Sequence, residues 1–288
     1  MVRDCLNALR AQTRPLDKII VVDNCSTDGT AKMLAKEFPE TQIETLAANI
    51  GGAGGFHHGI RSAHEEGYDW LWVMDDDTAA APDALEQLLA ARSPEAGALA
   101  CLIRDLRGCI NAGHHKLVYG PLMLIRKPKE LEPSWNDDLP AILPLDANAF
   151  LGIMFPRTVV GQIGLPEADF FIYNDDTEYT YRVSRRWPIH LVTGAVIIDR
   201  QGSLLDIGAN ATMAHPSPWR QYYGLRNAIR FRLRYSLFAG VAYGIASYTK
   251  QFIEALSGVD GFAARRLAYL TRGLIDGMLE RGGQRVLP

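Results

Sequence analysis

Apolar runs alternate with amphipathic stretches along the first half of the chain, and this alternation predicts strands that are each followed by a helix. The short apolar runs at 18–23, 41–46 and 70–74 have the length and composition of buried strands. Each run is followed by a stretch with helical spacing, and these stretches end near residues 38, 64 and 91. The pattern is typical of a parallel α/β sheet covered by helices.

The pattern changes in the second half of the chain. The region 104–145 is rich in proline and glycine and has no clear period, whereas 150–155 and 190–198 are apolar enough to form two further strands. From residue 219 onward the apolar positions follow a helical spacing. We therefore expect an α/β domain over residues 1–215 and a basic helical extension over residues 216–288.

The start of the sequence departs from this scheme. Cys5, Leu6 and Leu9 lie on one face of a helix-like stretch, whereas a doubly wound sheet usually begins with a strand. We therefore expect an α/β sheet that lacks its first strand in this sequence. A misassigned start codon would explain the difference.

Composition describes an ordinary globular protein. Hydrophobic residues make up 48% of the chain and charged residues 22%, which excludes a disordered tail, a collagen-like chain and a small disulfide scaffold. The longest nearly unbroken apolar stretch is 237–248, well short of the roughly 20 residues of a membrane span. The N-terminus has no signal-peptide pattern, and no pair of the four cysteines has metal-ligand spacing, so we expect a cytoplasmic protein with reduced thiols.

Charge is divided unevenly between the two parts of the chain. Residues 216–288 contain 11 Lys and Arg against 4 Asp and Glu, a balance of +7, which leaves −10 for residues 1–215. The net charge of −3 argues against a general nucleic-acid binder. The acidic part is suited to a cation. The basic, aromatic-rich part is suited either to peripheral contact with an anionic membrane surface or simply to solvent.

Three adjacent carboxylates, Asp75, Asp76 and Asp77, directly follow the apolar run 70–74. Ligands of open α/β sheets bind at the carboxyl ends of strands, and a divalent cation would relieve the repulsion among these side chains. The other interpretation is a helix cap followed by solvated turn residues. The preceding strand favours the metal site, because it delivers the acids to a fixed edge of the sheet.

A second and a third candidate motif lie nearer the N-terminus. Asp23 ends the first strand and is placed to accept a hydrogen bond from a nucleobase or a ribose, although the polar residues 24–29 also suit a simple turn. The glycine-rich turn 49–55 lets the backbone approach a phosphate or ribose closely. It matches neither G-x-G-x-x-G nor a P-loop, so a plain turn stays open for it as well.

A second acidic cluster follows the aromatic run 170–173. Asp175, Asp176 and Glu178 are suited either to a general base or to an acidic helix N-terminus. His215, in Ala-His-Pro, is a candidate third metal ligand beside the first acidic cluster, although a lone histidine is more often a surface or core residue. The other histidines, including His114, are expected to be ordinary surface or loop residues.

Together these motifs resemble the family 2 glycosyltransferases with the GT-A fold. The resemblance rests on four patterns in order: Val-Val-Asp-Asn-x-Ser-Thr-Asp-Gly-Thr, Asn-x-Gly-Gly-x-Gly-Gly, a strand followed by Asp-Asp-Asp, and Phe-Phe-Ile-x-x-Asp-Asp-x-Glu. The glycine motif, and Tyr-Tyr-Gly-Leu-Arg-Asn after His215, look like the galactofuranosyl- and rhamnosyltransferase branch. The resemblance covers roughly residues 6–279. Each pattern alone is weak, but their order and spacing are specific.

The resemblance implies a Rossmann-like, mixed but mostly parallel sheet and an inverting transfer from a nucleotide-sugar such as a UDP- or dTDP-sugar to a glycan or lipid-linked acceptor. The family's metal, Mn²⁺ or Mg²⁺, would be held by Asp75, Asp77 and His215. The implied catalytic base is Asp176. The implied substrate-binding residues are Asp23, Asn49, Gly51, Gly52, Asp76, Asp175, Glu178 and Trp219. Family members usually begin with a strand that helps to bind the nucleobase, which is the strand missing here.

Two other functions compete with this one. A nucleotide-sugar-binding protein without turnover would fit the missing strand, but a pure binder needs no second acidic motif. A nucleotidyltransferase also combines a glycine loop with acidic metal ligands. It would normally carry a basic residue in that loop to hold a triphosphate, and residues 49–55 contain none.

Overall fold

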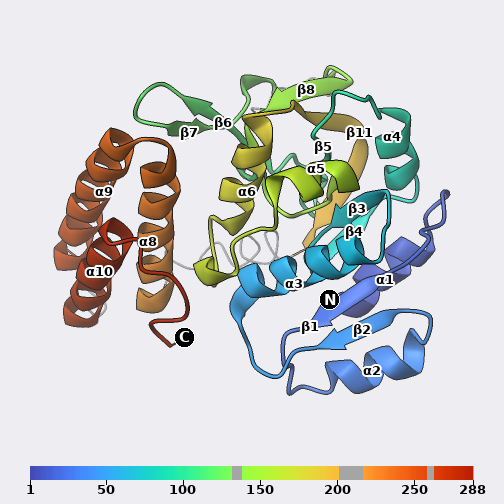
Figure 1. The fold of residues 1–288 in the computed structure, drawn as a ribbon, viewed down its shortest axis with the longest axis horizontal. Coiled ribbons are helices and arrows are strands. Elements are labelled where there is room, and N and C mark those ends of the chain that lie inside the picture. Colours follow the sequence, from blue (N-terminus) through green and yellow to red (C-terminus); the bar gives the residue numbers. More distant parts are fainter. Residues whose placement is uncertain (132–137, 201–216, 258–262, 288) are drawn as a thin grey trace.

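The computed structural model describes residues 1–131, 138–200, 217–257 and 263–287. An α/β part that contains the sheets packs against a bundle of three C-terminal helices, and β1 and β2 lie at the end of the α/β part away from β6, β7 and β8 (Figure 1). The predicted helical extension is therefore present. The division into domains at residue 215 stays a prediction, because apolar clusters join the two parts.

The larger sheet has mixed strand directions, as expected. Its strands run in the order β3 (Trp70–Val73), β10 (Ile153–Pro156), β5 (Ala98–Arg104), β11 (Ile189–Asp199) and β4 (Thr78–Ala80), and β8 (Ile142–Leu145) also pairs with β11. Among the described strands of this sheet, only β5 and β11 pair in parallel. The expected predominance of parallel pairs is not found, because β10 runs in the opposite direction between β3 and β5 and so separates two strands that point the same way.

Two smaller sheets flank the larger one. The strands β1 (Ile20–Asp23) and β2 (Gln42–Thr45) pair in parallel, and β6 (His115–Tyr119) pairs with β7 (Leu124–Arg126) and β9 (Ala147–Asn148). The described chain begins with α1 (Val2–Arg10), whose Cys5, Leu6 and Leu9 pack in one cluster with apolar residues of β1 and β3. The helix thus joins two sheets that share no described strand pairing.

In the described ranges, five further helices cover the sheets. They are α2 (Thr30–Glu37), α3 (Gly51–Glu65), α4 (Ala84–Ala90), α5 (Arg157–Ile163) and α6 (Asp175–Ser184), with short 3₁₀ turns at Ala112–His114, Lys129–Leu131 and Ala168–Phe170. The start of α3 is hydrogen-bonded to the residue after β1, because the Asn24 side chain donates to the Gly51 carbonyl. It is also bonded to the segment ahead of α6, because the Ala53 N–H donates to the Phe171 carbonyl. The first turns of α3 and α6 therefore bring the glycine-rich and second acidic motifs to one region.

The central strand β5 was not expected from the sequence. Ala98, Ala100 and Leu102 face one buried cluster, whereas Leu99 and Cys101 face another. A strand that is buried on both faces shows a continuous apolar run without alternation, and its alanines and leucines suit a helix equally well. Its periodicity therefore gives no strand signal.

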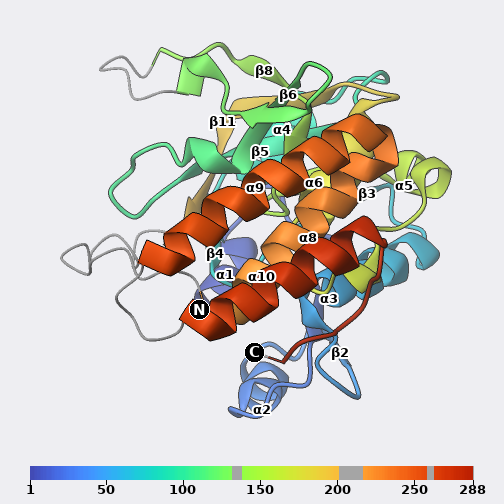
Figure 2. The same cartoon turned by 90° about the vertical axis from the view of Figure 1, so that its left-hand side faces the viewer.

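The C-terminal bundle consists of α8 (Pro218–Tyr235), α9 (Leu237–Ser257) and α10 (Ala263–Met278). The helix α8 faces the α/β part, and α9 and α10 lie on its outer side (Figures 1 and 2). Proline at the first position of α8 suits a helix start, because that position needs no backbone donor. None of the helices in the described ranges is both long and apolar enough to cross a membrane.

Candidate active site

Asp23, at the end of β1, is the buried acid predicted to contact the nucleobase. Its side chain is only 4% exposed, and its Oδ1 accepts a hydrogen bond of 3.0 Å from the backbone N–H of Ser26. Its Oδ2 is buried without a hydrogen-bond partner. Buried carboxylate oxygens are normally paired. The lack of a partner therefore makes this oxygen a candidate acceptor for a ligand.

The glycine-rich turn leads directly into α3 and is joined to the end of β1. The side chain of Asn24 donates to Asn49 Oδ1 (3.2 Å) and to the carbonyl of Gly51 (3.0 Å), and Asn49 Oδ1 accepts from the Gly51 N–H (2.9 Å). Gly51 has φ +78°, where a side chain would be strained and would meet the backbone of Phe171. A Cβ on Gly52 would meet open space. The backbone at Gly52, in the first turn of α3, is thus open to close approach, as expected for phosphate or ribose.

The first acidic cluster lies between β3 and β4. The surface of the Asp75 side chain is exposed to solvent, but many protein atoms lie around the carboxylate and partly desolvate it. Desolvation first, and then repulsion from Asp77, Asp76, Asp175 and Asp176, raise its pKa well above the usual range. Desolvation and the charges of Asp76 and Asp199 also raise the pKa of Asp77.

The second acidic cluster begins α6. Asp175 is buried, and desolvation together with the charge of Asp176 raises its pKa to about 7. One oxygen of Asp176 accepts hydrogen bonds from the backbone N–H and the hydroxyl of Thr177. The other lies 3.7 Å from the Lys116 ammonium.

The two acidic clusters therefore converge, although about 100 residues separate them in the sequence. Asp175 and Asp176 lie close enough to Asp75 to raise its pKa. Like charges are brought together only at a cost, so the arrangement suits a site that binds a cation. His215, the third predicted ligand, lies outside the described residues.

Glu178 has a different place from the predicted one. It is fully buried, and its carboxylate pairs with Arg182 (3.1 Å) and Arg234 (2.7 Å) and accepts from the Tyr235 hydroxyl (3.3 Å). The side chain thus faces α8 and joins the two parts of the molecule. Its burial argues against direct contact with a substrate.

Trp219 lies in the first turn of α8, partly exposed. Its ring packs edge-on against Tyr223, with 6.3 Å between the ring centroids, and the guanidinium of Arg220 lies over it at 5.3 Å. This position, four residues beyond His215 in the sequence, leaves part of the indole open for a ligand.

Sequence reasoning missed several residues of the site. Lys116, on β6, lies against Asp176 and donates to the Thr177 hydroxyl (2.5 Å). Asp199 ends β11, is buried, and pairs with His114 (3.5 Å) and Asn111 (3.2 Å) near Asp77. His114 is therefore not an ordinary loop residue as expected. Asp199 could have been predicted, because it directly follows the predicted strand 190–198. Lys116 could not, because no strand is predicted in the irregular region 104–145.

The chemistry of the donor set fits a divalent cation only in part. Within the described ranges, no three carboxylate, imidazole or thiol side chains are arranged to hold a metal ion. Asp75 and Asp77 nevertheless supply hard oxygen ligands where negative charge is in excess, and oxygens of a bound diphosphate would complete such a shell.

Comparison with known sequences supports the same family. The model of the family described as glycosyl transferase family 2 matches residues 1–136. The galactofuranosyltransferase GlfT1 of Mycobacterium tuberculosis is 34% identical over 188 residues, which are 62% of this chain and 59% of that protein. An N-acetylglucosaminyl-diphospho-decaprenol L-rhamnosyltransferase from the same organism is 25% identical over 61% of this chain and 63% of its own length. The chain thus spans about three fifths of the length of these curated relatives.

Solved structures show the same fold at low identity. GalNAc-T7, crystallised with UDP, GalNAc and Mn²⁺, superposes with a TM-score of 0.59 over 96% of this chain and 53% of that chain, at 13% identity. Residues 1–349 of Staphylococcus aureus TarS superpose with a TM-score of 0.52 over 97% of this chain and 88% of that chain, also at 13% identity. The predicted GT-A fold is therefore confirmed.

Proposed function

Because the glycosyl transferase family 2 model matches residues 1–136, we propose that this chain transfers a sugar from a nucleotide-diphospho-sugar to an acceptor hydroxyl, with inversion at the anomeric carbon. The observation that carries the proposal is the convergence of the Asp75 cluster with Asp175 and Asp176. A protein that only binds a nucleotide-sugar would need one acidic cluster. Two clusters provide a cation site and a base on either side of a bound donor.

The proposed donor sugar is galactofuranose or rhamnose, carried by UDP or dTDP. Similarity to a galactofuranosyltransferase and to an N-acetylglucosaminyl-diphospho-decaprenol rhamnosyltransferase supports this choice. It also supports a glycan or lipid-linked glycan as acceptor, in the synthesis of cell-wall or surface polysaccharide.

Donor binding would use the edge formed by β1, α3 and β3. The unpartnered oxygen of Asp23 would accept from the base, and Asn49, Gly51 and Gly52 would line the phosphates or ribose. Asp76 would contact the ribose or the donor sugar. Mn²⁺ or Mg²⁺ held by Asp75, Asp77 and His215 would neutralise the charge of the diphosphate leaving group.

Asp176 would remove the acceptor proton as the hydroxyl oxygen attacks the anomeric carbon. Its Oδ2 lies 3.7 Å from the Lys116 ammonium, whereas its Oδ1 accepts from Thr177. Asp175 and Trp219 would help to place the acceptor or the donor sugar. One displacement breaks the bond to the diphosphate and inverts the centre without a covalent intermediate.

A donor panel tests this proposal. Thermal shift with UDP-galactofuranose, dTDP-rhamnose and other nucleotide-sugars, each with and without Mn²⁺, should give a metal-dependent rise in melting temperature for one donor. Transfer from that donor to a lipid-linked acceptor should then be detected by mass spectrometry and be lost in excess EDTA. No stabilisation by any donor, or full transfer in EDTA, would contradict the proposal.

We also propose that the C-terminal bundle attaches peripherally to the inner face of the cell membrane, where a lipid-linked acceptor would lie. Large apolar side chains are exposed along the outer helix α9: Leu237 (74%), Phe238 (64%), Ile245 (57%), Ile253 (60%) and Leu256 (61%). The neighbouring α10 carries exposed arginines, and both helices lie on the same outer side of the molecule (Figure 2). An apolar face flanked by cations suits an anionic bilayer surface.

Liposome flotation tests the attachment. The pair Phe238→Glu and Ile245→Glu should reduce binding to vesicles that contain anionic lipid by about tenfold or more, since both the apolar contact and the charge balance are lost. The matched control, Glu254→Gln with Lys250→Gln, changes exposed residues of the same helix without changing its net charge. Equal binding of the two double variants would reject the attachment site.

A further inference from the structure

The segment that leads into Asp175 and Asp176 has an unusual backbone. Phe171, Tyr173 and Asn174 have φ values of +65°, +68° and +64°, a region that residues other than glycine rarely adopt. Such a conformation persists only where surrounding contacts enforce it. The segment 169–174 determines where α6 begins, and therefore where both carboxylates lie.

Two adjacent residues of α8 enforce this conformation. The Asn227 amide Nδ2 donates to the carbonyls of Phe170 (2.9 Å), Ile172 (2.7 Å) and Tyr173 (2.9 Å). Arg226 donates to the Phe170 carbonyl (2.7 Å), and its Nε also donates to Asn227 Oδ1 (2.7 Å). Both side chains are fully buried. They end the Tyr-Tyr-Gly-Leu-Arg-Asn motif, for which the proposed chemistry gives no role.

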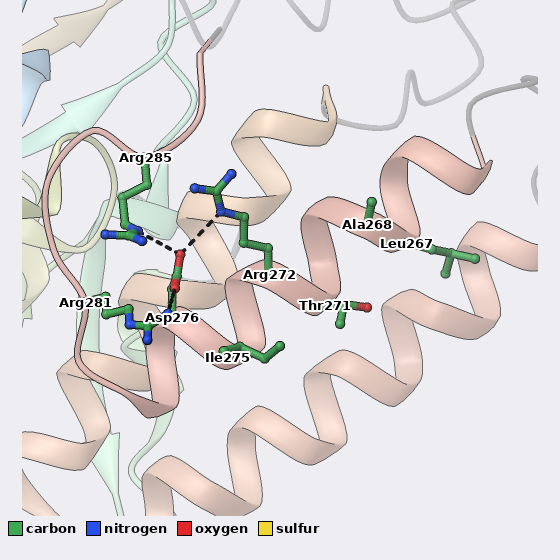
Figure 3. Close-up of a pocket in the computed structure, with 8 residues that line it drawn as sticks. All are labelled: Leu267, Ala268, Thr271, Arg272, Ile275, Asp276, Arg281 and Arg285. Atoms are coloured by element: carbon green, nitrogen blue, oxygen red, sulfur yellow. Dashed lines mark hydrogen bonds and ion pairs between the residues drawn. The ribbon is translucent and has the colours of Figure 1, made fainter.

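The same motif is itself anchored on its other side by α10 and the C-terminal segment. Arg226 donates to the carbonyl of Gly283 (2.7 Å), the Tyr223 hydroxyl to the carbonyl of Val286 (2.9 Å), and the Tyr222 hydroxyl to Asp276 (2.7 Å). Asp276 is buried, and Arg272, Arg281 and Arg285 converge on it (Figure 3). The motif is therefore a rigid support rather than an exposed surface.

The segment 169–174 is also hydrogen-bonded to the glycine-rich turn, which is proposed to bind the nucleotide-sugar. The backbone N–H of Ala53, in the first turn of α3, donates to the Phe171 carbonyl (3.1 Å). The absence of a side chain at Gly51 permits this close approach. The segment thus lies between the glycine-rich turn and α8, and is bonded to both.

We infer that Asn227, supported by Arg226, is a positioning residue for the proposed reaction: it holds the segment 169–174 so that Asp176 faces the acceptor hydroxyl. The inference rests on the proposed function. Within the segment, Asn227 bonds to backbone carbonyls, so it acts on the base through the start of α6. A displacement of about 1 Å at a reacting group is enough to lower a rate about 100-fold.

Two substitutions of Asn227 test the inference against a matched control. Asn227→Ala removes the three hydrogen bonds that the amide donates to the segment, and Asn227→Asp keeps the size of the side chain but cannot donate to the carbonyls. Leu225→Ala is the control: Leu225 is equally buried on α8 but packs with Ile229 and Leu270, away from the segment. The measurements are kcat and donor KM for transfer, melting temperature, and hydrogen exchange of residues 169–176.

For the Asn227 variants we expect kcat to fall about 100-fold while donor KM changes less than about threefold, and exchange of residues 169–176 to become faster. Leu225→Ala should lower the melting temperature but keep kcat within about threefold of the native value. The inference is overturned if both Asn227 variants keep kcat within about threefold of this control, or if the loss of activity lies in donor KM. If the native chain transfers no sugar at all, the proposed function fails. Hydrogen exchange of residues 169–176 is then the deciding measurement. Faster exchange in both Asn227 variants, but not in Leu225→Ala, supports the positioning role of Asn227, and equal exchange in all three variants rejects it.

Discussion

Individual carboxylates of the candidate active site differ in their neighbours, and these neighbours indicate different roles. Asp23 has one buried oxygen without a partner, Asp176 has one oxygen beside Lys116, and Asp175 is buried beside another carboxylate. The acids themselves were predictable, because each follows an apolar or aromatic run that ends at one edge of the fold. Lys116 and Asp199 were not, since their contacts depend on how the irregular region 104–145 and the strand β11 pack.

Asp176→Asn tests the base directly. The amide has the same size but cannot take a proton, so donor binding should stay within about threefold while transfer falls by about 10²–10⁴-fold. Calorimetric titration with the donor and Mn²⁺ measures the first quantity, and a product assay measures the second. Turnover equal to that of the native chain would discard the assignment of the base.

Asp175→Asn should stabilise the metal-free chain at neutral pH. The folded state keeps the Asp175 proton up to about pH 7, whereas an unfolded chain releases it near pH 4. Stability is therefore lost as pH rises from about 4 to about 7, and the full penalty remains above pH 7. Removing the charge should raise the free energy of unfolding by a few kcal/mol at pH 8 and by much less at pH 5.

Urea unfolding in EDTA at these two pH values measures the effect of Asp175→Asn. The exposed Asp28→Asn offers a control, because Asp28 lies outside both acidic clusters and accepts hydrogen bonds from Thr30. It should not gain stability at pH 8. An Asp175→Asn chain no more stable than the native one at pH 8 would show that the acid does not carry a raised pKa.

At the scale of elements, the site depends on two helix starts whose loops are hydrogen-bonded to each other. The segments 49–55 and 169–174 meet where the Ala53 N–H bonds to the Phe171 carbonyl. Local patterns predicted that α3 follows the glycines and that α6 begins near Asp175. They did not predict the contact between the two loops, because a left-handed backbone at Phe171 and Tyr173 has no signature in a sequence without glycine there.

Substitutions of the neighbouring Gly51 and Gly52 should distinguish an effect on folding stability from an effect on donor binding. Gly51→Ala places a methyl group against the Phe171 backbone at a positive φ, so we expect a loss of roughly 2–4 kcal/mol in the free energy of unfolding together with weaker donor binding. Gly52→Ala meets open space in a helix, so stability should stay equal or rise by up to about 1 kcal/mol.

Donor titration completes the glycine comparison. If phosphate or ribose approaches Gly52 as proposed, its alanine variant should bind the donor less tightly although it is fully stable. Unchanged donor affinity in Gly52→Ala would place the donor elsewhere along the edge.

For the whole molecule, the C-terminal bundle is part of the same folded body as the α/β part. Phe231 of α8 is fully buried against Tyr181 of α6, with 5.4 Å between ring centroids, and Glu178 and Arg234 form an ion pair between the same helices. The sequence indicated a boundary near residue 215 from the change in charge and period. It could not indicate how much apolar surface the two parts would share.

Phe231→Ala should therefore lower the stability of both parts together. We expect a loss of about 3–5 kcal/mol and a single calorimetric transition at lower temperature, because the cavity opens in a shared cluster. Ile245→Ala, at an exposed position of α9, should change stability by less than about 0.5 kcal/mol. Two separate transitions in the Phe231 variant would support independent domains.

The single carbonyl of Phe171 also limits how this scaffold could acquire a new sugar preference. Any redesign of the turn 49–55 that admits a bulkier donor must move a backbone amide to which the loop ahead of Asp176 is bonded. Libraries that vary only one of these two loops would therefore mostly yield inactive proteins. Paired variation of 49–55 and 169–174 is the route by which selectivity can be exchanged without losing turnover.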